Sequence, residues 1–140
     1  MGYRINSALA SCAPTPKAKP KKSADYLAFV RRLPCILTGK YGVEAAHLSM
    51  AATEYGHYGR GRGAKSPDRW ALPLCGEAHR RQHEIGESLF WRNAGVDPHI
   101  LSLVIWGLWS DLKDDAEPFA SAIINQTLAS TGRLKAKDEA

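Results

Sequence analysis

The chain has 140 residues, a net charge of +5 at neutral pH and a pI near 9.2. This length favours one domain and excludes two independent cores, and a hydrophobic fraction of 44% fits a soluble globular protein. No apolar run approaches the roughly 20 residues of a membrane span, and the excess of basic residues favours a polyanionic partner, either nucleic acid or an acidic surface.

The N-terminal segment, residues 1–22, is rich in Ala, Pro, Lys and Ser and has few large apolar side chains. Such a segment cannot bury enough surface to offset the entropy lost on ordering, so a disordered basic arm is predicted. Residues 1–24 hold five basic and no acidic residues, which equals the net charge of the whole chain. Two interpretations stay open, a solubilising spacer and an arm that contacts DNA.

The first predicted helix runs through DYLAFVRRL, with Ser23 as its cap and Pro34 at its end. Its apolar residues recur at helical spacing and are expected in the core: Tyr26, Leu27, Val30 and Leu33. After it, CILT is predicted to form a short strand, GKYG a turn, and VEAAHL a second strand that His47 closes.

The middle of the chain, from His47 to His83, combines a basic loop, a strand and a polar helix. The loop contains GRGRGAK, in which glycines alternate with Arg60 and Arg62, a pattern that suits close approach to a phosphate backbone. RWALPLC is predicted to be a strand and GEAHRRQHEIG a helix. His79 and His83, four residues apart, would then share one helix face and could bind one divalent metal ion together.

Positive charge gathers in this same region. Residues 60–81 contain six basic residues against two acidic ones, a local charge of +4. Five of the basic residues are predicted to contact DNA phosphates: Arg60, Arg62, Lys65, Arg80 and Arg81. Such contacts give affinity with little sequence specificity.

Two further helices are predicted in the C-terminal part. Asp97 and Pro98 supply a cap and a first-turn proline for a helix through HILSLVIWGLWSDL. This helix is apolar nearly all round, so it is either a central core helix or a docking or dimer surface formed by residues that include Val104, Trp106 and Trp109. Glu117 and Pro118 open the last helix, FASAIINQTLAST, which Gly132 ends.

The sequence GRGRGAKSPDRWALPLC, followed by HRRQH, resembles the HNH or ββα-metal endonuclease superfamily. Within it, these motifs look like those of the phage recombination-enhancement (Ref-like) nucleases, and the resemblance covers about residues 26–98. The resemblance implies an α+β fold, with a ββα-metal core at about 35–86 in a domain of residues 23–132. Flanking helices at about 98–131 and a frayed tail at 133–140 would complete the chain.

The resemblance also implies a role for each candidate site residue. His47 would be the general base that takes a proton from the attacking water, and Asp68 would pin the loop across it. His79 and His83 would hold one divalent ion, Mg²⁺, Mn²⁺ or Zn²⁺. The implied activity is metal-dependent hydrolysis of DNA phosphodiester bonds in phage recombination or repair.

The chain departs from the superfamily beside the predicted base. Many members have an acidic residue or a second histidine there as a metal ligand, whereas this chain has Ala46 and Leu48. The third ligand is therefore open: His57 and Asp68 are candidates, although His57 also fits a loop or phosphate contact. Alternatively His47 is itself a ligand and the base is missing.

A second departure concerns structural zinc. Related nucleases often carry two C-x-x-C pairs, but the equivalents here begin at Cys35 and Cys75 and lack the second cysteine. No structural zinc is expected, and both thiols should be buried near each other as small apolar groups. With Cys12 the chain has three widely spaced cysteines, which argues against disulfides and for a reducing compartment.

The sequence leaves rival functions open. One is a DNA-binding module of the same fold without catalysis, which the alanine at position 46 supports. Another is an accessory protein of a recombinase filament that docks through the tryptophan-rich helix. The protein is expected to be cytoplasmic, because no secretory signal is recognisable and no membrane contact is indicated, and to be a monomer or a weak homodimer.

Overall fold

A computed structural model describes residues 23–59 and 66–134. The predictions for the basic arm at 1–22, for Arg60, Arg62 and Lys65, and for the last six residues of the tail lie outside the described residues.

Helix α2, Ala24–Arg31, confirms the first predicted helix and buries Tyr26, Phe29 and Val30. Ser23 occupies the N-cap position, but its side chain makes no capping hydrogen bond, so that part of the prediction was wrong. Instead the backbone N–H of Ser23 donates to Asp68 Oδ2 at 2.8 Å. The start of α2 is therefore tied to a segment 45 residues away.

The segment CILT is a turn, which corrects the prediction of a strand. The backbone N–H of Cys35 donates to Lys40 O, and that of Gly39 donates back to Cys35 O, both at 2.9 Å. Gly39 has a φ of +73°, a conformation that favours glycine. A single bond from Ile36 N–H to Pro73 O links the turn to the sheet edge. A run of three apolar residues followed by a threonine was too short to distinguish a strand from a buried turn.

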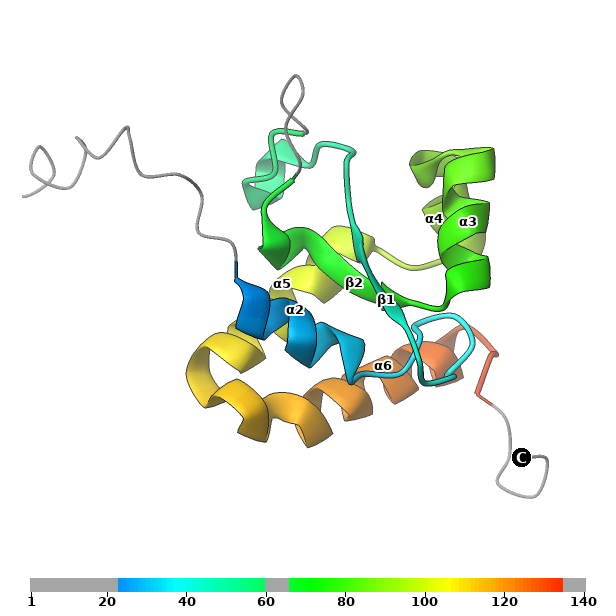
Figure 1. The fold of residues 1–140 in the computed structure, drawn as a ribbon. Helices are drawn as coiled ribbons and strands as arrows, with labels where there is room; N and C mark the ends of the chain where they lie inside the picture. The colour runs from blue at the N-terminus through cyan, green and yellow to red at the C-terminus, as the bar shows by residue number, and fades with distance from the viewer. Residues whose placement is uncertain (1–22, 60–65, 135–140) are drawn as a thin grey trace, which may run out of the picture.

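The sheet consists of β1, Glu44–His47, and β2, Ala71–Leu74, which pair antiparallel with Glu44 opposite Leu74 and His47 opposite Ala71. Helix α3, Gly76–Ile85, follows β2 after one residue. The long connection between the strands contains two short 3₁₀ helices, η1 at Thr53–Tyr55 and η2 at Asp68–Trp70. The predicted order of strand, loop, strand and helix is confirmed, and the fold is α+β (Figure 1).

Four more helical segments complete the described chain: α4 at Glu87–Ala94, α5 at Pro98–Leu112, η3 at Lys113–Ala116 and α6 at Glu117–Ser130. Helix α4 packs on α3, whereas α2 covers both strands and α5 lies between β2 and α6 (Figure 1). Phe90 and Trp91 of α4 are buried in the core. Among the described residues, no helix is both long and apolar enough to span a membrane.

Helix α5 begins as predicted, because the Asp97 side chain accepts hydrogen bonds from the backbone N–H groups of residues 99 and 100. Leu101 and Ile105 are buried in the core. Trp106 and Trp109 pack against Tyr26, with ring centroids 4.8 and 5.2 Å away. The contacts therefore support the core-helix interpretation for this face.

Candidate functional site

His47 ends β1, and its Nε2–H donates to Asp68 Oδ1 at 2.8 Å. The other oxygen of Asp68 accepts the backbone N–H of Ser23, so both carboxylate oxygens are engaged. The His47 side chain is 25% exposed and that of Asp68 14%. Because a carboxylate can only accept, it holds the proton of the neutral imidazole on Nε2 and leaves Nδ1 as the basic nitrogen.

The register of the sheet explains this contact. Ala71 lies opposite His47, and the ladder continues through a bond from Leu48 N–H to Trp70 O at 3.0 Å. Asp68, two residues further back in η2, therefore lies over the end of β1. The predicted position of Asp68 across His47 agrees with this geometry.

His79 and His83 face each other on α3, with their Nε2 atoms 3.3 Å apart and their ring centroids 4.9 Å apart. Two nitrogen ligands of a tetrahedral ion, each bound at about 2.0–2.1 Å, lie roughly 3.3 Å apart. The pair therefore fits two ligand positions of one metal ion. His79 is partly buried, whereas His83 is exposed.

Glu44, at the start of β1, is a site residue that the sequence analysis missed. Its Oε1 lies 2.8 Å from His79 Nδ1, so it holds a proton on Nδ1 and leaves the Nε2 lone pair facing His83. Histidine ligands of metals commonly have such a carboxylate partner, and that rule was the available signal. Gly76 permits the approach, because a Cβ there would lie 2.9 Å from Glu44 Oε2.

Within residues 23–59 and 66–134, no third protein ligand accompanies the pair. In the part of the chain that the structure describes, no three His, Cys, Asp or Glu side chains are grouped closely enough to hold a metal ion. Asp68 is already bonded to His47 and Ser23. Beyond His79 and His83 the described residues offer such an ion no ligand, so water or substrate oxygens would fill positions left open there.

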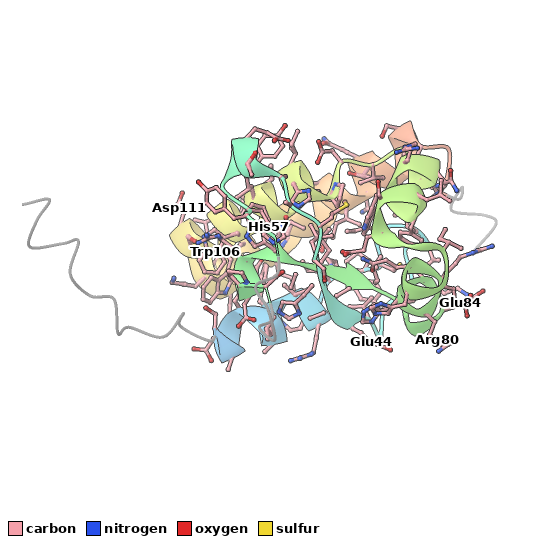
Figure 2. The ribbon with its side chains drawn as sticks, turned by 90° about the horizontal axis from the view of Figure 1, so that it is seen from above. Glu44, His57, Arg80, Glu84, Trp106 and Asp111 are labelled. Atoms are coloured by element: carbon pink, nitrogen blue, oxygen red, sulfur yellow. The ribbon has the colours of Figure 1, made fainter. Side chains whose placement is uncertain are left out.

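His57 does not join the pair, and its predicted role as third ligand is not supported. It is 1% exposed, with Nδ1 3.0 Å from His99 Nε2 and Nε2 3.2 Å from Ser66 Oγ. Figure 2 shows His57 well separated from Glu44 at the other end of the sheet. Burial, together with neighbouring His99 and Arg69, lowers the pKa of His57, so this imidazole is neutral near pH 7.

Glu87 connects the strand that carries His47 to the helix that carries the histidine pair. Its carboxylate accepts the backbone N–H of Ser49 at 2.8 Å and the Nε2–H of buried Gln82 at 3.0 Å. Ser49 follows β1, and Gln82 lies on α3. Glu87 thereby fixes the position of α3 relative to the end of β1. The sequence analysis did not predict these contacts.

The two described cysteines are free and lie close together, as predicted. Burial raises the pKa of the Cys35 thiol, but hydrogen bonds from Thr38 and from the backbone N–H groups of Cys75 and Leu37 bring it below its ordinary value. Cys35 is fully buried, whereas Cys75 is only partly buried, contrary to expectation. The turn keeps N–H groups aimed at Cys35 sulfur.

Two of the five predicted DNA contacts fall within the described residues. Arg80 and Arg81 are exposed and follow His79 directly on α3. Figure 2 shows Arg80 beside Glu44, at the end of the molecule that holds the histidine pair. A phosphate near the pair would meet positive charge on the same helix.

A family model matches more than half of the chain. The sequence model of the DUF968 family, described as a protein of unknown function, matches residues 7–105. The chain belongs to the DUF968 family. The matched part includes both strands, α3, α4 and the start of α5, so all the site residues above lie within it. No curated protein and no solved structure matches the chain.

Proposed function

We propose that this DUF968 protein is a metal-dependent DNA endonuclease of the HNH type. The observation that supports it most is the carboxylate-held His47 at the end of β1, in a ββα unit whose helix carries the facing imidazoles of His79 and His83. A positioned base and a pair of metal ligands are the two elements that hydrolysis of a phosphodiester requires here.

His47 Nδ1 would take the proton of the attacking water. Asp68 holds the ring in the tautomer that this step needs, and its negative charge stabilises the imidazolium that forms. The partial exposure of His47 leaves room for water and a phosphate beside it. The exposed guanidinium groups of Arg80 and Arg81 would neutralise neighbouring phosphates.

His79 and His83 would hold one divalent ion through their Nε2 atoms, and Glu44 would orient His79. When bound, the ion supplies Lewis-acid stabilisation of the negative charge on the scissile phosphate. Among Mg²⁺, Mn²⁺ and Zn²⁺, two imidazole ligands favour Zn²⁺.

A DNA-binding module without catalysis is the second candidate. It is favoured by Ala46, which stands where many HNH enzymes have a ligand, and by the lack of a third protein ligand among the described residues. Such a module would bind DNA in a salt-dependent way and leave it uncut.

The test is nicking of a supercoiled plasmid in the presence of Mg²⁺, Mn²⁺ or Zn²⁺. We expect the wild-type protein to cut with at least one ion, and His79→Ala and His83→Ala to lose both metal binding and cleavage. His47→Ala should bind metal and DNA but cut at least about 100-fold more slowly. Salt-dependent binding without nicking under all three ions would support the non-catalytic module. Loss of metal binding in His47→Ala would make His47 a ligand.

A further inference from the structure

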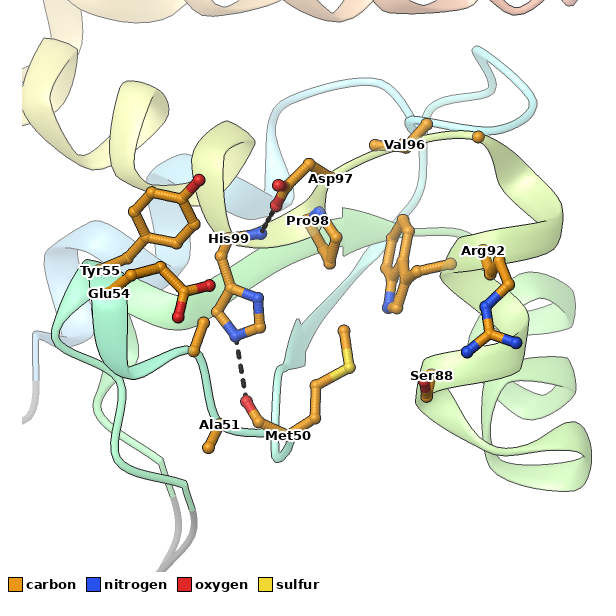
Figure 3. Close-up of a pocket in the computed structure, with 13 residues that line it drawn as sticks. Met50, Ala51, Glu54, Tyr55, Ser88, Arg92, Val96, Asp97, Pro98 and His99 are labelled. Atoms are coloured by element: carbon orange, nitrogen blue, oxygen red, sulfur yellow. Dashed lines mark hydrogen bonds between the residues drawn. The ribbon is translucent and has the colours of Figure 1, made fainter.

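A cavity of about 450 Å³, wide open to solvent, lies between the segment after β1, η1, α4 and the start of α5 (Figure 3). This volume is within the range of roughly 300–1,000 Å³ that is typical of small-molecule sites. None of its lining residues belongs to the His79–His83 pair, and the proposed hydrolysis does not use it.

One wall of the cavity is a row of hydrogen-bond donors on α4. Ser88, Trp91 and Arg92 all line it and follow the spacing i, i+3 and i+4, which puts them on one helix face. Their donors are a hydroxyl, an indole N–H and a guanidinium. The indole N–H of Trp91 is closed off from solvent, so the donors on this wall that are open to a ligand are those of Ser88 and Arg92. The wall therefore suits a ligand group rich in acceptor oxygens, such as a phosphate.

The opposite wall has a different chemistry. Glu54 and Tyr55 of η1 lie across the cavity from Ser88 and Arg92 (Figure 3). Tyr55 is 36% exposed and lines the cavity with an aromatic side chain, and Met50 and Pro98 add apolar surface. The carboxylate of Glu54 would repel a phosphate, but it could accept a hydrogen bond from an amino group of a base. A nucleotide would therefore bind with its phosphate on α4 and its base on η1.

The cavity lies close to His47. Met50, which lines it, is three residues after His47, so their Cα atoms are at most about 11 Å apart. Glu87, the residue before Ser88, holds both Ser49 and Gln82. The wall formed by Ser88, Trp91 and Arg92 is thus fixed relative to His47 and to α3.

We propose that this cavity binds one unpaired nucleotide of the DNA strand that is cut. The proposal rests on the endonuclease function, and it names the substrate class as single-stranded or locally unpaired DNA. A base in continuous duplex is stacked and paired, and it would have to leave the stack before it could reach Tyr55. The cavity would therefore favour DNA in which the base is already unpaired and unstacked.

The test measures DNA binding in EDTA and at one fixed salt concentration. Without a divalent metal ion the DNA is not cleaved during the measurement. Fluorescence anisotropy compares a labelled single-stranded oligonucleotide with a hairpin duplex. We expect the wild type to prefer the single strand, and Arg92→Gln and Tyr55→Ala each to weaken that binding roughly tenfold, with duplex binding nearly unchanged. Arg31→Gln and Tyr41→Ala, at exposed positions outside the cavity, are matched controls that should bind as the wild type does.

The outcomes separate this proposal from the endonuclease function. Equal affinity of the wild type for single strand and duplex, or unchanged single-strand binding in both cavity variants, would overturn the cavity assignment even if plasmid is nicked. Conversely, a preference that depends on Arg92 and Tyr55 in a protein that nicks no DNA would uphold the cavity and reject the nuclease. Thermal melting of each variant confirms that it is folded.

Discussion

At the scale of single residues, the chemical role open to each histidine depends on the groups that its ring nitrogens contact. Carboxylates hold His47 and His79 in one tautomer, each at 2.8 Å, and both rings are partly exposed. His57 and His99 instead contact each other inside the protein, where no carboxylate is bonded to either ring. The first two are suited to proton transfer or metal binding, whereas the buried pair is suited to holding segments together.

Replacing Glu44 by Gln should weaken metal binding about 10- to 100-fold, because a neutral amide supports the basicity of His79 less than a carboxylate does. Isothermal titration calorimetry with Zn²⁺ measures the change. Glu77→Gln, which removes an exposed carboxylate from the first turn of the same helix, is the matched control and should bind as the wild type does. Equal affinities in the two variants would mean that Glu44 does not act on the metal site.

The buried His57 makes the free energy of unfolding depend on pH. Its pKa is lowered in the folded protein, so below about pH 6.5 the unfolded chain takes up the proton first. Stability should therefore be fully present above that pH, fall as the pH drops through 6.5, and level off below the folded pKa. Urea unfolding between pH 8 and 5 measures this, and His57→Gln should show a smaller fall. An unchanged pH dependence in the variant would assign the effect to other groups.

At the scale of elements, α5 depends on one cap. Asp97→Ala removes the acceptor for two backbone N–H groups and should lower the free energy of unfolding by about 1 kcal/mol in urea titrations. Asp111→Ala, at the exposed far end of α5, is the control. A carboxylate there opposes the helix dipole, so its removal should cost nothing. Equal losses in both variants would show that the cap contributes no specific stability.

The second element is the basic loop predicted around Arg60, Arg62 and Lys65, whose proposed role in binding phosphates can be measured. Each lost phosphate contact should lower the slope of log affinity against log salt by roughly 0.9 on duplex DNA or 0.7 on single strands. A triple variant of Arg60, Arg62 and Lys65 to Ala should therefore flatten the slope by about two to three units. We expect its melting temperature hardly to change, because charged side chains of a polar, glycine-rich segment usually contribute little to folding. If the triple variant keeps the salt slope and the cleavage rate of the wild type, DNA binds at another face of the protein.

At the scale of the whole molecule, the net charge resides in the N-terminal segment. Deleting residues 1–22 removes five basic residues and should weaken DNA binding and its salt dependence, while turnover of bound DNA is preserved. Single-turnover cleavage at saturating protein separates the two effects. A slower rate at saturation would mean that the arm takes part in the site itself.

The sequence by itself determined the features that depend on neighbours within one helical turn. The spacing of His79 and His83 predicted that they face each other, and Asp97 before Pro98 predicted the start of α5, because both relations are local along a helix. The 3.6-residue period likewise predicted α2, and the start and stop signals at Glu117, Pro118 and Gly132 predicted α6. The prediction of a strand at CILT was wrong, since three apolar residues and a threonine suit a strand and a buried turn equally.

Only the tertiary structure decided which distant groups meet. Glu44 reaches His79 across 35 residues, Glu87 reaches Ser49 across 38, and His57 finds His99 across 42. These contacts follow from the antiparallel register and from the packing of α3, α4 and α5 around the strands, and both depend on the whole core forming at once. Side-chain periodicity says which face of an element is buried, but it carries no information about what that face will meet.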